Sequence, residues 1–373
     1  MKNFSLTLLL LCCASFAFAQ NYQIDFNVTG FKDQTKFYLE DVANQDIIDS
    51  AVIVGNKFTM TGKAKNIPTN LWIHANYQNN YYYTVLFIAD DHVKVSGDIS
   101  QMPFALKITG AKEQDLFNSL YSRIGIDYKK RDTLMKQVFA LNGDTAKVNP
   151  EKRKILAVVR HLDSSDDSLR IAFIHQHLNS YFALSELDYL KGQYNRDTLQ
   201  KMYNSLLPQY RDSHYGKVVA TYLKVGDPLK TGDPFTDFAG QDRNGNLHKL
   251  SEIKNKYILL DFSATWCGPC MKSVQEIKDL IGQYPDKLSV VTFSEDAGKS
   301  TWIEGLNRDK SEWLSLWDGK GIDSETSLKY GVTGFPTFFL IDPHGKIVAS
   351  QVGYDTGVLK QMLQSAKIDA NPL

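Results

Sequence analysis

Apolar and polar residues alternate with a period of two along the first third of the chain, and this pattern predicts half-buried β-strands. The alternation is clearest over residues 22–28 and 36–39, and residues 54–60 predict two strands around a turn at Gly55-Asn56. Further strands are expected over residues 70–76, 82–88, 93–96 and 105–108. Strand signals at such close, regular spacing are typical of a small sandwich or barrel. We therefore expect an all-β domain over residues 20–110.

The apolar spacing changes from a strand period to a helical period after residue 110. The first residues expected on one helix face are Leu116, Phe117, Leu120 and Tyr121. Apolar residues between 155 and 187 continue the helical spacing. We expect a helical middle segment over residues 111–225 that acts as a spacer or a partner-binding element.

A Gly- and Pro-rich stretch over residues 226–234 predicts a boundary, and we expect a separate domain over residues 226–373. Residues 256–262 form a continuous apolar run that suits a buried central strand, and residues 271–281 have helical spacing. Two cysteines, Cys267 and Cys270, lie between this strand and this helix. The order of strand, cysteine pair and helix predicts an α/β domain with the pair at the start of the helix.

Composition narrows the classes of partner. The chain has 373 residues, enough for roughly two or three domains. Its 42 Lys and Arg residues balance 42 Asp and Glu residues, so the formal net charge is zero. A neutral chain gives no electrostatic reason to expect nucleic acid as a partner, and we expect none.

The N-terminus has the pattern of a secretory signal peptide over residues 1–19. Lys2 supplies the positive charge, residues 6–18 supply the apolar run, and Ala17-Phe18-Ala19 supplies the cleavage motif. We expect cleavage after Ala19 and export to the periplasm.

Export changes what the four cysteines can do. A lipoprotein anchored through Cys12 or Cys13 is the weaker alternative, because such processing needs a small residue before the cysteine and Leu11 precedes Cys12. Cleavage after Ala19 would remove Cys12 and Cys13 and leave Cys267 and Cys270. Because the two cysteines are only three positions apart, a disulfide between them would close too short a loop to stabilise the fold. A structural zinc site is also not expected, because it needs about four ligands. Their role is therefore predicted to be chemical reactivity.

The expected place of Cys267 at a helix start explains that reactivity. Unpaired N–H groups and the helix dipole favour a thiolate there and lower a cysteine pKa from about 8.5. We expect Cys267 to attack a disulfide and Cys270, about one turn further in and more buried, to resolve the mixed disulfide. Pro269 fixes φ near the helix start. Asp261 lies in the apolar strand, where burial should raise its pKa and suit it to act as base for Cys270; a purely structural carboxylate is the alternative.

Two segments resemble the thioredoxin family. One is the active-site stretch Asp-Phe-Ser-Ala-Thr-Trp-Cys-Gly-Pro-Cys over residues 261–270, and the other is the cis-proline loop Tyr-Gly-Val-Thr-Gly-Phe-Pro-Thr over residues 330–337. The resemblance covers residues 235–367 and implies a thioredoxin fold there. It also implies a cis bond between Phe335 and Pro336, with the Phe335 backbone exposed to pair with substrate. The remaining residues it places beside the substrate are Trp266, Gly268, Pro269 and Gly353.

The segment between the active-site helix and the cis-proline loop is longer than in a minimal thioredoxin. Residues 290–314 predict a strand, a helix and a short strand, an insertion similar to that of the exported TlpA-type disulfide reductases. The lysine that partners the buried acid in thioredoxins has no counterpart after residues 291–293. Residues 49–62 resemble part of the β-rich domain found ahead of thioredoxin-like domains in Bacteroidetes proteins.

These patterns predict a thiol–disulfide oxidoreductase that uses the Cys267–Cys270 dithiol, with no cofactor and no metal. The Gly268-Pro269 dipeptide between the cysteines is the one associated with reducing thioredoxins. The resemblance implies reduction of protein disulfides in the cell envelope and re-reduction by a membrane thiol donor such as a DsbD/CcdA-type protein.

Two other functions stay open. A peroxiredoxin-like thiol peroxidase shares the fold, but its signature has a threonine three residues before the cysteine, where this chain has Ala264. A client-binding envelope protein with accessory redox activity would make the first two domains primary. In that case Tyr81-Tyr82-Tyr83 would form a contact surface, whereas the other interpretation places these rings in a β-core.

Overall fold

The computed structural model describes residues 21–43, 46–141 and 149–368. The expected signal peptide over residues 1–19 lies outside the described residues. The chain divides into two compact units, one comprising residues up to 40 together with 48–118, and the other comprising residues 41–47 and those from 119 onward. Each unit is described by itself.

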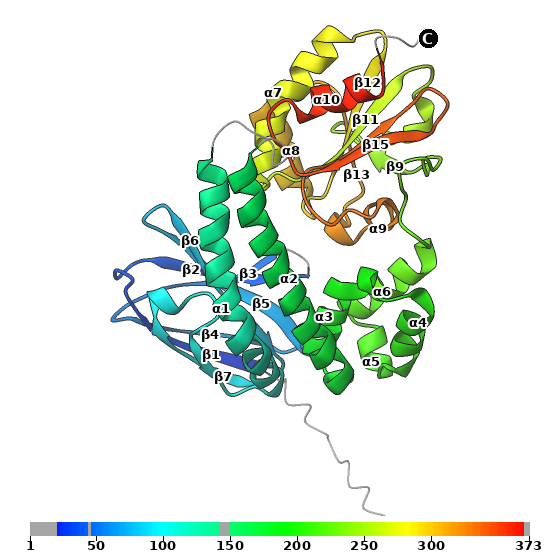
Figure 1. Ribbon diagram of the computed structural model, residues 1–373. Helices are drawn as coiled ribbons and strands as arrows, with labels where there is room; N and C mark the ends of the chain where they lie inside the picture. Colours follow the sequence, from blue (N-terminus) through cyan, green and yellow to red (C-terminus); the bar gives the residue numbers. More distant parts are fainter. Residues whose placement is uncertain (1–20, 44–45, 142–148, 369–373) are drawn as a thin grey trace, which may run out of the picture. The chain divides into compact units, whose positions relative to one another are not determined.

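The first unit is a sandwich of two four-stranded β-sheets, which confirms the all-β prediction (Figure 1). One sheet has the order β4-β1-β7-β8 and the other has the order β3-β2-β5-β6. The strands are β1 (Asn21–Thr29), β2 (Lys36–Asp41), β3 (Asp46–Val52), β4 (Lys57–Lys63), β5 (Thr69–Tyr77), β6 (Asn80–Ile88), β7 (His92–Asp98) and β8 (Lys107–Thr109). The last strand lies slightly later in the chain than the predicted 105–108.

Period-two alternation buries one face of each sheet in a shared core. In β1 every second residue from Tyr22 to Val28 is buried, and Phe26 stacks on Phe58 with ring centroids 4.4 Å apart. The predicted turn is also present, since Gly55 and Asn56 both have positive φ, 57° and 67°. Two consecutive left-handed residues favour Gly and Asn, so the local sequence determines this turn.

The three consecutive tyrosines of β6 were expected to lie either on a contact surface or in the β-core, and the structure shows both environments. Tyr82 packs against the core, with its ring 5.6 Å from that of Phe31. Tyr81 is 49% exposed, and its ring lies 6.0 Å from that of Tyr83. Alternation along the strand places the first and third rings on the face opposite the second.

Helices follow the sandwich, as the helical spacing predicts. They are α1 (Lys112–Ala140), α2 (Pro150–His177), α3 (Tyr181–Leu190), α4 (Arg196–Ser205), α5 (Pro208–Arg211) and α6 (His214–Val225). Side-chain caps begin several of them: Ser180 accepts from the Ala183 N–H at the start of α3, and Asn195 accepts from the Thr198 N–H at the start of α4.

The C-terminal part has the thioredoxin fold, built on a seven-stranded sheet of order β10-β9-β13-β12-β11-β14-β15. Its strands are β9 (Ala239–Gln241), β10 (Leu247–Lys249), β11 (Tyr257–Ser263), β12 (Leu288–Ser294), β13 (Leu314–Trp317), β14 (Thr337–Ile341) and β15 (Ile347–Val352). Its helices are α7 (Gly268–Gln283), α8 (Lys299–Asp309), α9 (Glu325–Tyr330) and α10 (Val358–Ser365). Strands β11, β12 and β13 are parallel, and β14 and β15 form an antiparallel hairpin.

Helices α7 and α10 pack on one face of this sheet, with Ile277, Leu280 and Leu359 in a single core cluster. Tyr330 of α9 packs on the opposite face with Phe262 and Phe293. Helix α8 and strand β13 form the predicted insertion. Strands β9 and β10 were not predicted, because three-residue strands are too short to show a period.

Candidate active site

The candidate active site lies where the parallel strands β11 and β12 end. On the face of the sheet toward α7, apolar residues such as Leu259 and Val290 occupy the middle of the strands. One pleat further on, polar side chains replace them: Asp261 and Ser263 on β11, and Thr292 and Ser294 on β12. Sites of α/β proteins gather at the carboxyl ends of parallel strands, and this chain places its polar residues there.

The two cysteines connect β11 to α7 and form a disulfide with an S–S distance of 2.02 Å. Cys267 is the N-cap residue of α7, and its sulfur accepts a hydrogen bond from the Cys270 N–H at 3.1 Å. Pro269 lies in the first turn of the helix. Both cysteines are buried, at 5% and 3% exposure, so their exposure differs little. What distinguishes Cys267 is its place at the amide end of the helix.

Asp261 is buried beneath the disulfide, at 3% exposure. Burial raises its pKa to about 7, as expected for a carboxylate in an apolar strand, and a hydrogen bond from the Thr292 hydroxyl to Oδ2 (3.0 Å) opposes that rise. The Trp313 indole N–H donates in turn to Thr292 Oγ1 at 2.9 Å. Within the described residues the other carboxylate oxygen, Oδ1, has no hydrogen-bond partner.

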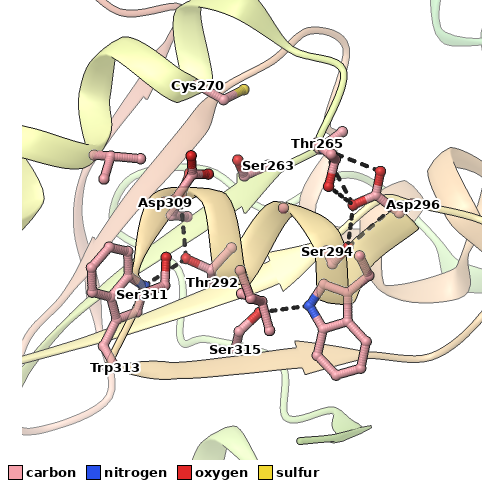
Figure 2. Close-up of a pocket in the computed structure, with 16 residues that line it drawn as sticks. Ser263, Thr265, Cys270, Thr292, Ser294, Asp296, Asp309, Ser311, Trp313 and Ser315 are labelled. Carbon is pink, nitrogen blue, oxygen red and sulfur yellow. Dashed lines mark hydrogen bonds between the residues drawn. The ribbon is translucent and has the colours of Figure 1, made fainter. Parts of the chain in front are cut away.

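Asp261 and Cys270 both line a cavity of about 40 Å³. Figure 2 shows Cys270 with the polar side chains around this cavity. The hydroxyl side chains that line it are Ser263, Thr265, Thr292, Ser294, Ser311 and Ser315. A polar space of this size has room for an ordered water, which the unpartnered oxygen of Asp261 could bind. The carboxylate of Asp261 and the buried residue Cys270 thus share one polar cavity.

The outer side of the disulfide is bounded by aromatic and backbone groups. Trp266 is 53% exposed, and its ring meets that of Phe335 edge to face at 5.5 Å. Phe335 packs against the cluster that Ala264, Cys267 and Cys270 form, and the Phe335–Pro336 bond is cis, as the resemblance to thioredoxins implies. Among the described residues, no hydrogen bond engages the Phe335 N–H or carbonyl. Gly353 donates its N–H to the Pro336 carbonyl at 2.8 Å.

Asp261 thus shares a cavity with Cys270, and Phe335 packs against the cluster that holds both cysteines. Gly353 contacts Pro336, the neighbour of Phe335. Gly268 leaves open space where a side chain would stand. The sequence did not identify Thr292 or Trp313 as partners of the acid. Thr292 lies directly opposite Asp261 in the β11–β12 pairing, so its role depends on strand register.

Neither a membrane span nor a metal cluster is found in the part of the chain that the structure describes. No helix there is both long and apolar enough to cross a membrane. No group of three or more His, Cys, Asp or Glu side chains there could hold a metal ion.

Comparison with known proteins agrees with this geometry. Residues 230–365 match the Redoxin family, and residues 22–117 match a domain of unknown function, DUF4369. The thioredoxin-like protein YneN of Bacillus subtilis is 32% identical over 153 residues, which are 40% of this chain and 86% of that protein. The thiol-disulfide oxidoreductase ResA of Geobacillus thermodenitrificans is 30% identical over 154 residues, again 40% of this chain and 86% of that protein.

Among solved structures, a thiol-disulfide oxidoreductase from Bacteroides fragilis is 27% identical and aligns with a TM-score of 0.34, covering 36% of this chain and 99% of that one. The relatives of known sequence and the Redoxin match are enough to assign the family. The chain belongs to the thioredoxin-like superfamily, as a TlpA-type oxidoreductase of the thiol–disulfide class that carries a β-rich N-terminal domain.

Proposed function

We propose that this protein reduces protein disulfides in the cell envelope through the Cys267–Cys270 dithiol. The observation that carries the proposal is the position of Cys267 as N-cap of α7, where its sulfur accepts the Cys270 N–H. The same N–H and the helix dipole would hold the negative charge of a Cys267 thiolate once the disulfide is reduced.

The reaction takes place in two exchanges. The Cys267 thiolate attacks one sulfur of the substrate disulfide, forms a mixed disulfide and releases the other substrate sulfur as a thiolate. Cys270 then loses its proton and attacks the Cys267 sulfur, which releases the second substrate thiolate and restores the Cys267–Cys270 disulfide. Two electrons pass to the substrate, and a membrane thiol donor of the DsbD/CcdA type would return them to the protein.

Asp261 is proposed as the base for Cys270. Its raised pKa of about 7 suits proton exchange near neutral pH, and the cavity that it shares with Cys270 provides the path. On the outer side, Trp266, Gly268, Pro269 and Gly353 would border the bound segment. The free Phe335 N–H and carbonyl beside Pro336 would pair with the backbone of the substrate.

We propose further that residues 226–373 form the catalytic domain and that the chain is exported after cleavage behind Ala19. The catalytic domain would then reach the periplasm together with the domain over residues 20–110 and the segment over residues 111–225.

Substitution of the two cysteines tests the order of attack. Cys270→Ser should accumulate mixed disulfides with envelope proteins, visible on non-reducing gels, whereas Cys267→Ser should form none and reduce nothing. The Cys267→Ser variant is the matched control, because it leaves one cysteine of the pair in place. Mixed disulfides that form through Cys270 in the Cys267→Ser variant would overturn the assignment.

The reduction potential tests the direction of electron flow. A reductant should have a potential near that of thioredoxin, about −270 mV, whereas a value near about −120 mV would indicate an oxidant. Equilibration of the purified protein with glutathione mixtures gives this value. Peroxide turnover measured on the same sample distinguishes the peroxidase alternative.

A further inference from the structure

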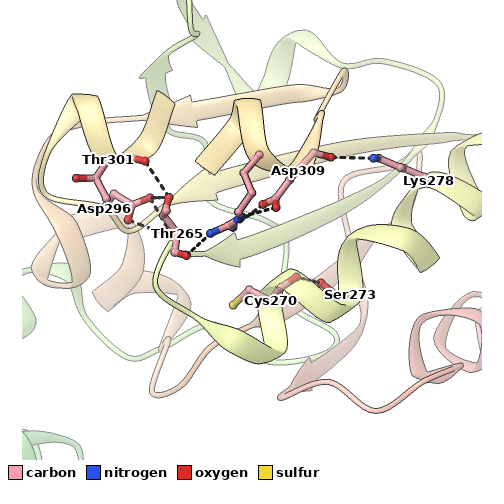
Figure 3. A network of polar contacts seen from close by, with 8 residues as sticks. Thr265, Cys270, Ser273, Lys278, Asp296, Thr301 and Asp309 are labelled. Carbon is pink, nitrogen blue, oxygen red and sulfur yellow. Dashed lines mark hydrogen bonds and ion pairs between the residues drawn. The ribbon is translucent and has the colours of Figure 1, made fainter. Parts of the chain in front are cut away.

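The active-site turn just before the dithiol is held by the insertion. Residues 264–267 form a tight turn closed by a hydrogen bond from the Cys267 N–H to the Ala264 carbonyl at 3.1 Å. Thr265 is the second residue of that turn. The residues that engage its polar groups come from the end of β12 and from α8 (Figure 3).

Asp296 holds the amide and hydroxyl of Thr265. The Thr265 N–H donates to both carboxylate oxygens of Asp296, at 3.1 and 3.2 Å, and its hydroxyl lies 2.9 Å from Oδ2. The hydroxyl also lies 3.1 Å from the Thr301 carbonyl of α8. Asp296 is itself fixed, because it is 2% exposed, receives the Ser294 hydroxyl at 2.9 Å and accepts the Trp317 indole N–H on its carbonyl at 2.6 Å.

Arg308 holds the remaining polar group of Thr265. Its Nη1 donates to the Thr265 carbonyl at 2.8 Å, while Nε and Nη2 form a two-point contact with the Asp309 carboxylate at 2.7 and 2.8 Å. A planar guanidinium paired in this way loses little further freedom when it binds the carbonyl. The same helix approaches closely at Gly305, where an added Cβ would lie 2.2 Å from Thr265 Oγ1.

We propose that Asp296 and Arg308 are positioning residues that hold the turn over residues 264–267, so that the sulfur of Cys267 stays at the amide end of α7. The inference rests on the proposed role of Cys267 as the attacking thiolate. It gives the insertion a task in catalysis: α8 holds the backbone two residues ahead of the nucleophile. Neither residue touches the sulfur, and both act through Thr265.

We call the contacts of Asp296 and Arg308 with Thr265 the clamp. Loss of the clamp should weaken the stabilisation of the Cys267 thiolate. Arg308→Met removes the donor to the Thr265 carbonyl, and we expect the pKa of Cys267 in the reduced protein to rise by about one unit, which means about tenfold slower alkylation at pH 6. Arg308→Lys keeps a donor and a charge, so it should recover most of this loss. Arg243→Met is the matched control, because Arg243 bonds Asn307 of the same helix and not Thr265.

A second variant perturbs the turn by a steric clash instead of by the loss of a hydrogen bond. Gly305→Ala should displace Thr265 and raise the Cys267 pKa, although alanine favours the helix itself. The double variant Gly305→Ala/Thr265→Ala removes the clashing hydroxyl and should lie closer to wild type than Gly305→Ala alone. Far-UV circular dichroism and urea unfolding establish that each variant is folded.

The outcomes separate this inference from the proposed function. Alkylation of the wild-type protein with the pH dependence of an ordinary free thiol would overturn the assignment of Cys267 as nucleophile. A lowered wild-type pKa that is unchanged in folded Arg308→Met or Gly305→Ala would overturn the clamp alone. A shift in these two variants, with recovery in Arg308→Lys and none in Arg243→Met, supports it.

Discussion

Asp261 and Thr292 lie opposite each other on the parallel strands β11 and β12, and the Thr292 hydroxyl donates to Oδ2 of Asp261 at 3.0 Å. Because the same hydroxyl accepts the Trp313 indole N–H, its own proton is directed at the carboxylate. This partner is neutral, whereas the resemblance to thioredoxins implies a lysine as the partner of the buried acid. Burial raises the pKa of Asp261 to about 7, and the hydrogen bond from the neutral Thr292 hydroxyl opposes that rise only in part.

The raised pKa of Asp261 should make the stability of the oxidised protein depend on pH. Between pH 4 and pH 7 the folded chain keeps a proton that the unfolded chain has released, so the free energy of unfolding falls as pH rises through this window. Asp261→Asn removes this effect and should stabilise the protein above pH 7 by up to about 4 kcal/mol. Urea unfolding at pH 4.5, 6 and 7.5 measures the difference.

Asp279→Asn provides the control for that experiment, since Asp279 is an exposed carboxylate on α7. It should leave the pH dependence of the wild type in place. If the curves of wild type and Asp261→Asn run parallel from pH 4.5 to 7.5, the proton on Asp261 contributes nothing and the proposed base loses its support.

Removal of the Thr292 hydroxyl should shift the resolving step to higher pH. Thr292→Val deletes a hydrogen bond to the charged form of Asp261, so the pKa of that carboxyl should rise further, by about one unit. The measurement is the rate at which Cys270 resolves a preformed mixed disulfide, followed as a function of pH. Thr292→Ser keeps the hydroxyl and should retain the wild-type profile, so equal shifts in both variants would contradict the role of the hydrogen bond.

The sequence predicts most of this architecture, because period-two and helical spacing are local signals. The strand over residues 257–263, the following helix and the cysteine pair between them are all readable from neighbouring residues. The cis bond before Pro336 came only from the resemblance, since nothing in the local pattern distinguishes it from a trans bond.

The residues that the sequence could not identify contact partners that lie far away in the sequence. Thr292 stands between two buried apolar residues and, taken locally, is an ordinary strand residue. Arg308, near the end of α8, has the pattern of a solvated helix charge, yet it holds a carbonyl 43 positions earlier in the chain. Such roles follow from strand register and helix docking, which depend on long-range packing and leave no periodic trace.

Trp266 should matter for protein substrates and not for small disulfides. Its ring is half exposed beside Phe335, where it would cover part of a bound polypeptide. For Trp266→Ala we expect KM for a protein disulfide to rise about tenfold, because buried aromatic contacts dominate interface energies. The rate with a small aromatic disulfide should change little.

Leu247→Ala is the matched control, since Leu247 on β10 is 67% exposed in the same domain and is not part of the site. A Trp266→Ala variant that loses activity equally toward protein and small disulfides would show that the ring supports the dithiol itself and not the substrate.

A buried ion pair joins the helices of the middle segment. Arg170 of α2 pairs with Glu186 of α3, and the Tyr121 hydroxyl of α1 lies 3.1 Å from the guanidinium and 3.3 Å from the carboxylate. Arg170→Met would leave Glu186, which is 4% exposed, as a buried acid without its cationic partner. We expect this variant to lose about 3–5 kcal/mol of unfolding free energy, as buried pairs do when one partner is removed.

The double variant Arg170→Met/Glu186→Leu separates the pair's own stabilisation from the cost of that orphaned charge. It replaces both charges with apolar side chains and should recover most of the loss, because apolar replacements of buried pairs are often neutral. Lys136→Met, which breaks an exposed pair with Asp132 on α1, should change stability little. Urea unfolding at neutral pH compares the three variants. If the double variant is as unstable as Arg170→Met, the pair contributes attraction that apolar packing cannot replace, and the three helices depend on it directly.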